Sequence, residues 1–158
     1  MVLGKENLYV NSQKNTNNEK NGHEFLLDTN ACIKYLKGDS LPVLQKLCSL
    51  PRHKVVLCDI VKVELYYGAY KSANTEKNLA VLDRLFNEFD NLPFDDKAVI
   101  KCAQIRAQLA AKGTPIGPYD FQIAAITLVN NLILVTHNTR EFSRIEGLRF
   151  EDWENLTN

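Results

Sequence analysis

"EFLLDTNACIKYLKG", residues 24–38, joins a short apolar run to an acid and then to a helical segment. The run over 24–28 has no polar alternation, which predicts a strand that is buried on both faces and ends at Asp28. Segment 30–38 predicts a helix that stops at Gly38, a residue suited to a helix C-terminus. A buried strand that leads directly into a helix is typical of α/β folds.

The same alternation continues along the rest of the chain. Strands are expected at 54–59 and 132–136, with shorter ones at 92–94 and 148–150. Helices are expected over 41–50, 60–72, 74–90, 96–113 and 119–130, with a helical turn at 140–142. This pattern predicts an α/β fold with a central, mainly parallel sheet flanked by helices in three layers. Ligands of such folds bind at the carboxyl ends of the strands.

The composition fits one domain preceded by a polar segment. Residues 1–23 are rich in Asn and Lys and lack periodicity, which predicts a disordered extension, and residues 24–158 are long enough for one domain with a core. The formal net charge of zero argues against broad, charge-driven binding to nucleic acid. The apolar runs are also too short to cross a membrane.

The four cysteines form no Cys-x-x-Cys pair, which argues against a zinc site: Cys32, Cys48, Cys58 and Cys102. The first thirty residues have no apolar segment of the signal-peptide type. We therefore expect reduced cysteines that serve as packing residues in a cytoplasmic protein.

Four acids fall near predicted strand ends and helix starts. Asp28 ends the first strand, Glu64 lies one turn into the next helix, Asp120 lies in the first turn of helix 119–130, and Glu141 follows the last long strand. Each has an ordinary structural explanation: a helix cap, a snorkelling side chain, a partner of the helix dipole and a surface acid, respectively.

Taken together, the four acids suggest a metal site. Bringing like charges together in a partly buried place is costly unless a cation lies among them. Oxygen ligands without His or Cys suit Mg²⁺ or Mn²⁺. Carboxylate-bound metals of this kind are suited to hydrolysis of a phosphodiester.

Four motifs carry a family resemblance: "LLDTNACIKYLKG", "VKVELYYGA", "IGPYDFQIAA" and "LVTHNTREFSRIEGLRFEDW". In this order, over about residues 24–154, they resemble the PIN-domain ribonucleases, and more narrowly the VapC toxins of bacterial toxin–antitoxin pairs. The resemblance implies a PIN domain over 24–158 that acts as an Mg²⁺- or Mn²⁺-dependent endoribonuclease.

The resemblance also implies roles for individual residues. The family's catalytic and metal-binding acids correspond to Asp28, Glu64, Asp120 and Glu141, the last being a position that is often Asp. Polar groups that hold these carboxylates and the attacking water correspond to Thr29, Thr136 and Asn138. By contrast, His137 is not an acid–base residue in the family, which favours phosphate contact or loop packing there.

Substrate and partners follow from the same resemblance. The "IGPYD" and "TREF" motifs resemble those of toxins that cut initiator tRNA in its anticodon stem-loop. Basic residues near the motifs are candidates for RNA contact: Lys34, Arg140 and Arg144, with Lys37 and Arg149 beside them. The resemblance implies a VapB-like antitoxin that covers the acids, held in a groove built from 40–50 and 74–90 with nearby tyrosines, and a homodimer.

Three alternatives remain open from the sequence. A structure-specific DNA nuclease would use the same acids, and only substrate competition separates it from a ribonuclease. A PIN-like module without catalysis would bind RNA or a partner, although all four acids are present. A phosphotransferase with an aspartyl nucleophile is disfavoured, because Asn30 stands where a second Asp would be needed.

Overall fold

The sheet of this protein is wholly parallel. The computed structural model describes residues 22–155, and within them five strands lie in the order β3-β2-β1-β4-β5. Their bounds are β1 Phe25–Leu27, β2 Val55–Cys58, β3 Asp90–Leu92, β4 Ile133–Val135 and β5 Arg149–Glu151. Each neighbouring pair is parallel. The α/β prediction with a parallel sheet is therefore confirmed.

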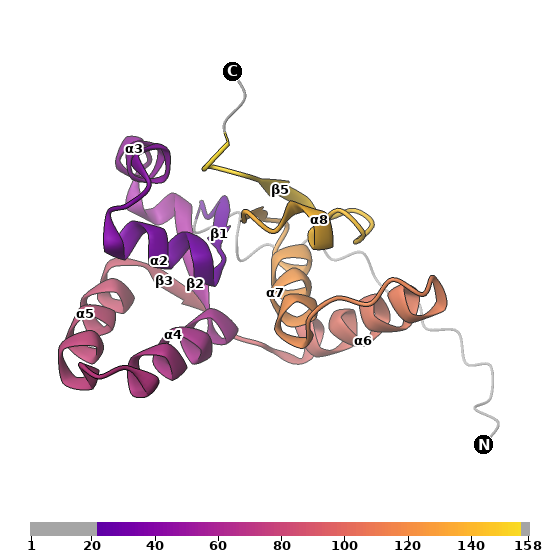
Figure 1. Ribbon diagram of the computed structural model, residues 1–158. Coiled ribbons are helices and arrows are strands. Elements are labelled where there is room, and N and C mark those ends of the chain that lie inside the picture. The colour runs from indigo at the N-terminus through magenta and orange to yellow at the C-terminus, as the bar shows by residue number, and fades with distance from the viewer. Residues whose placement is uncertain (1–21, 156–158) are drawn as a thin grey trace.

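Helices flank the sheet and connect its strands (Figure 1). They are α2 Thr29–Lys37, α3 Leu41–Ser49, α4 Asp59–Lys71, α5 Thr75–Glu88, α6 Asp96–Ala111, α7 Pro118–Val129 and the short α8 Thr139–Phe142, with a 3-10 turn at Arg52–Lys54. Helix α2 packs against α3 and α4, whereas α6 packs along α7. None of the helices in the described part is both long and apolar enough to span a membrane.

The edge strand β3 lies earlier than the sequence predicts. The strand expected at 92–94 is instead Asp90–Leu92, which pairs with β2 alone. An edge strand is buried less than a central one, and here no residue of β3 is fully buried, so no apolar run marks its position. Beyond it, the Phe94 backbone N–H donates to Asp59 Oδ2 at 3.2 Å, and the chain leaves the sheet there.

The core is built on the central strands. Every residue of β1 and β2 is buried. Trp153, after the last strand, is 1% exposed, and its ring lies edge-on to Phe25 with centroids 5.2 Å apart. Cys32 and Cys58 lie in this core as free thiols, and burial raises the pKa of Cys58 to about 11. These two cysteines are packing residues, as predicted. The prediction is wrong for Cys48, which is exposed.

The start of the described chain is packed against the sheet. The side chain of His23 is 3% exposed, and its Nε2 lies 2.9 Å from Asp90 Oδ2. The backbone of Glu24 pairs with Lys54 and, on its other side, with Ile133. The predicted extension lies outside the described residues up to position 21 and stays a prediction there.

Candidate active site

Asp28 lies where β1 ends and α2 begins. Its Oδ1 accepts a hydrogen bond from the Ala31 backbone N–H at 2.7 Å, so it is the N-cap of α2. The side chain is nevertheless buried at the carboxyl edge of the sheet. Burial raises the pKa of Asp28 to about 6; the Thr136 hydroxyl and the Ala31 N–H act against this, and Glu64 adds to it. The cap is thus also an acid that a nearby cation would stabilise.

Glu64 reaches the same edge from α4. The Thr29 hydroxyl donates a hydrogen bond to Glu64 Oε2, which joins the start of α2 to the side chain on α4. Glu64 is half-buried and does not snorkel into bulk solvent. Its charge raises the pKa of both Asp28 and Asp120, which places the three carboxylates close to one another.

Asp120 and Glu141 shift each other's pKa in opposite directions. Burial raises the pKa of Asp120 to about 7, and the hydrogen bond to Glu141 and the charges of Glu141, Glu64 and Asp28 act in the same direction. The pKa of Glu141 is lowered, first by its hydrogen bond with Asp120 and further by Gly117, Asn138 and Arg144. The hydrogen bond and the repulsion between the two carboxyls therefore favour the neutral form of Asp120 and the charged form of Glu141.

Neighbouring polar groups hold these acids in place. Asn138 Nδ2 donates to Asp120 Oδ2 at 3.3 Å, and the Asn138 backbone N–H donates to Thr136 Oγ1 at 3.0 Å. The Gly117 backbone N–H donates to Glu141 Oε2 at 3.4 Å. A Cβ on Gly117 would lie 3.3 Å from Asp120 Oδ2, so a side chain there would crowd the acid. Helix α7 then starts with Pro118, and proline is common at the first position of a helix.

The four predicted acids converge although they come from four separate elements. Asp28 precedes α2, and the others lie on α4, α7 and α8. The charges of Glu64 and Glu141 act on Asp120, and the charge of Glu64 acts on Asp28. Four carboxylates meet here, and the pKa values of two of them, Asp28 and Asp120, are raised. The all-oxygen donor set of the cluster fits a hard divalent cation.

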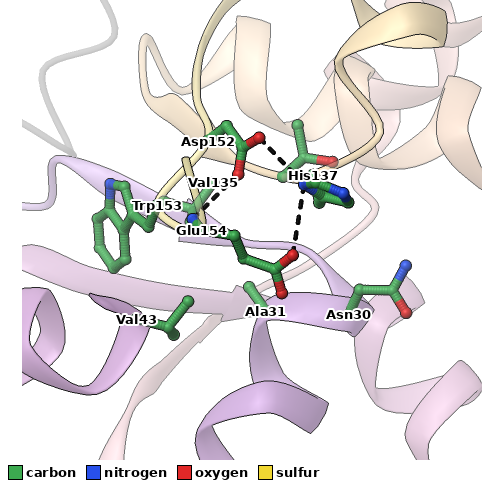
Figure 2. Close-up of a pocket in the computed structure, with 9 residues that line it drawn as sticks. Asn30, Ala31, Val43, Val135, His137, Asp152, Trp153 and Glu154 are labelled. Carbon is green, nitrogen blue, oxygen red and sulfur yellow. Dashed lines mark hydrogen bonds and ion pairs between the residues drawn. The ribbon is translucent and has the colours of Figure 1, made fainter. Parts of the chain in front are cut away.

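A second cluster beside this site was not predicted. His137 Nδ1 lies 3.0 Å from Asp152 Oδ2 and 3.3 Å from Glu154 Oε2, as Figure 2 shows. Asp152 and Glu154 are fifteen or more positions from His137, so no local spacing in the sequence connects them to it. The available signal was topological: β4 and β5 pair in parallel, so the residues that follow them meet.

The predicted RNA-contacting cations differ in their surroundings. Arg140 is exposed on α8, next to Glu141. Arg144 Nη1 donates to the Pro115 carbonyl at 3.0 Å. Lys34 Nζ lies 3.7 Å from Glu154 Oε1 and 3.8 Å from Asp39 Oδ1. Of these three, Arg140 has the exposure that a phosphate contact needs.

A groove of about 390 Å³ leads to the acids. Its lining residues come from α2, α4 and α5, among them Leu36, Leu65 and Leu82, and it reaches Glu64. Segment 74–90 contributes to it as predicted, while residues of α3 are not among its lining residues. Tyr67 and Tyr70 of α4 are close in sequence to the residues that line the groove, but their side chains are mostly exposed.

Comparison with known proteins identifies the family. The PIN domain family matches residues 25–148. The tRNA(fMet)-specific endonuclease VapC of Salmonella typhimurium is 43% identical over 130 residues, covering 82% of this chain and 98% of the relative. Ribonuclease VapC2 of Haemophilus influenzae is 36% identical over the same fractions.

Solved structures agree with this assignment. The crystal structure of DNA-bound VapBC from Salmonella typhimurium contains a chain that is 43% identical, with a TM-score of 0.78 over 83% of this chain and 98% of that one. VapBC2 from Rickettsia felis, bound to a promoter DNA fragment, gives 31% identity and a TM-score of 0.76 over 82% and 98%. The chain therefore belongs to the PIN-domain family and, within it, to the VapC proteins.

Proposed function

We propose that this protein is an endoribonuclease whose activity depends on Mg²⁺ or Mn²⁺ bound by Asp28, Glu64, Asp120 and Glu141. One observation carries the proposal: four carboxylates converge at the carboxyl edge of the sheet, where the pKa values of Asp28 and Asp120 are raised to about 6 and about 7. Burial raises both pKa values and the charges of the neighbouring acids raise them further, so a cation bound among the four would stabilise the charged carboxylates.

The protein's own groups position the acids for this chemistry. A bound divalent cation supplies charge that neutralises the phosphodiester and favours deprotonation of water. Asp28 is fixed by its cap hydrogen bond to Ala31, and Glu64 by the Thr29 hydroxyl. Asn138 orients Asp120 and bonds to Thr136. Thr29, Thr136 and Asn138 are therefore assigned positioning roles.

The substrate is a tRNA, and initiator tRNA cut in its anticodon stem-loop is favoured. The support is the 43% identity to an endonuclease that is named for tRNA(fMet). Arg140 is the first candidate for a phosphate contact because it is exposed and adjacent to Glu141, with Arg144 and Lys34 further candidates. A stem-loop is read by its shape and unpaired bases, which suits a protein of zero net charge.

The protein acts as the toxin of a toxin–antitoxin pair and is inhibited by a VapB-like antitoxin. Support comes from the similarity of this chain to the VapBC structures of Salmonella typhimurium and Rickettsia felis. The groove between α2, α4 and α5 fits an apolar segment of such a partner, since leucines line it together with Glu64. A partner in this groove would reach the acids directly.

Cleavage of total tRNA tests the proposal. We expect one discrete cut with Mg²⁺ or Mn²⁺, mapped by sequencing of the ends, and loss of at least ~100-fold in rate with chelator or with Asp28→Ala. Asp83→Asn, an exposed acid of α5, is the matched control and should cut normally.

Three results would contradict the proposal. Cutting that survives Asp28→Ala would show that the acid cluster is not the active site. Preferential cutting of a DNA stem-loop of the same sequence would favour the DNA nuclease. Binding of tRNA by the metal-loaded protein without cleavage would favour the non-catalytic module.

A further inference from the structure

We propose that His137, Asp152 and Glu154 form a second cation site, selective for a transition metal such as Zn²⁺ and separate from the four-acid cluster. The proposal does not depend on ribonuclease activity, because it uses none of the acids assigned to that activity. It rests on the donor atoms, on the backbone that positions them and on the space beside them.

The three side chains offer a compact donor set. One ligand atom from each, the imidazole Nδ1 and two carboxylate oxygens, lies within 4.8 Å of the others. Such atoms are about 3 Å apart around a shared ion, because metal–ligand distances are about 2 Å. Small side-chain rotations would bring the group to that geometry, and Figure 2 shows all three side chains turned toward one another.

The fold, rather than local sequence, creates this set. His137 follows β4 and the two acids follow β5, and these strands pair in parallel with Val135 opposite Glu151. Residues just beyond the two strand ends therefore lie side by side. The Thr136 backbone N–H donates to the Glu151 carbonyl at 3.0 Å and continues the pairing up to His137.

The backbone that carries the acids is fixed. Asp152 and Glu154 flank Trp153, whose side chain is 1% exposed, and the Trp153 indole N–H donates to Glu151 Oε2 at 2.7 Å. Asp152 Oδ1 accepts from the Glu154 backbone N–H at 3.0 Å. A buried anchor between two ligands limits the entropy lost when an ion binds.

The chemistry of the donors selects the class of metal. Mg²⁺ prefers octahedral geometry and oxygen ligands, and the four-acid cluster supplies such oxygens. An imidazole with two carboxylates suits Zn²⁺ and its neighbours in the first transition row, with water in the open position. A pocket of about 10 Å³, lined by the three residues, has room for one water-sized occupant.

Exposure and a competing charge make the site a weak, exchangeable one. The His137 side chain is 55% exposed, and the two acids are 17% and 23% exposed. Lys34 Nζ lies 3.7 Å from Glu154 Oε1 and opposes a cation there. We expect micromolar affinity, and we expect Lys34→Met to tighten Zn²⁺ binding by about three- to tenfold.

Imidazole NMR on the full chain tests the site. The sequence has three histidines, so a ¹⁵N-labelled sample gives three imidazole ring patterns while Zn²⁺ is added. We expect the His137 Nδ1 signal to shift and saturate with one equivalent, while His23 and His53 serve as internal controls. Asp120→Asn, which disables the four-acid cluster, should keep this response. Lys37→Met, on the same helix as Lys34, should leave the affinity unchanged.

Variants decide between this site and binding elsewhere. His137→Gln and, independently, Asp152→Asn should remove one Zn²⁺ equivalent in calorimetry, whereas His53→Gln should not. A His137 signal that stays unchanged up to ten equivalents would overturn the proposal. So would Zn²⁺ binding that is lost in Asp120→Asn and intact in His137→Gln, because the four-acid cluster would then account for it.

Discussion

The N-cap hydrogen bond of Asp28 and the burial of its carboxyl group have opposite effects on the charged form of the side chain. Its carboxylate caps α2, yet its burial raises its pKa to about 6 from an ordinary value near 4. The native state therefore holds a proton that the unfolded chain releases between these pH values. The stability that this proton contributes is present below about pH 4 and is lost as pH rises through about 6.

The substitution Asp28→Asn keeps the N-cap and removes the buried charge. Asn is as good an N-cap as Asp and carries no charge. In chelator at pH 8 we expect the variant to be more stable than the natural protein by about 1–3 kcal/mol, with the difference vanishing near pH 4. Denaturant unfolding at the two pH values measures this. A variant that is less stable at pH 8 would show that the charge of Asp28 is already compensated without metal.

The sequence predicted the four acids but left two roles open for Asp28. A helix cap and a site carboxylate looked like alternatives, and the structure shows one side chain in both positions. The missed group, His137 with Asp152 and Glu154, depends on a pairing between strands that no local pattern reports. The distance between two residues along the sequence does not tell whether paired strands bring them together in space.

The turn before α7 positions the Asp120 side chain. Gly117 has an ordinary negative φ, so alanine is compatible with its backbone. Its added Cβ would nevertheless lie 3.3 Å from Asp120 Oδ2, and the carboxylate must move by a few tenths of an ångström. We expect Gly117→Ala to slow tRNA cleavage by about tenfold while the midpoint of thermal unfolding changes little.

Gly68 in α4 provides the matched glycine control. Apart from its chain neighbours and the nearby backbone of its own helix, no described heavy atom lies within 4 Å of the position that its Cβ would take. Gly68→Ala should raise stability by about 0.5–1 kcal/mol and leave cleavage unchanged. Equal cleavage by both alanine variants would mean that the close approach at Gly117 has no catalytic consequence.

The helices and strands could be predicted where burial gives their sequence a clear apolar pattern. The central strands β1, β2 and β4 are apolar runs because helices cover both faces of the sheet. The edge strand β3 has one paired side and a partly exposed sequence, so periodicity placed it two residues late. Since all strands are parallel, their carboxyl ends share one edge, which is why the acids could be grouped from sequence.

The solvent-exposed face of α4 is unusually apolar. Val63, Tyr67 and Tyr70 have the i, i+4, i+7 spacing of one helix face, and they are 52%, 64% and 67% exposed. Isolated apolar residues are common on protein surfaces, but a stripe along one helix marks a contact surface. We propose that a second copy of the chain covers this stripe, which gives the homodimer that the family resemblance implies.

Light scattering of the purified full chain at micromolar concentration measures the dimer. We expect a mass of twice 18.0 kDa for the natural protein and a shift toward 18.0 kDa for Tyr67→Glu, because a charge at the centre of the stripe would be buried on association. Leu41→Glu, a 65% exposed residue on α3, is the matched control and should remain dimeric. A natural protein that is monomeric under these conditions would leave the stripe to another partner, and the dimer would be excluded.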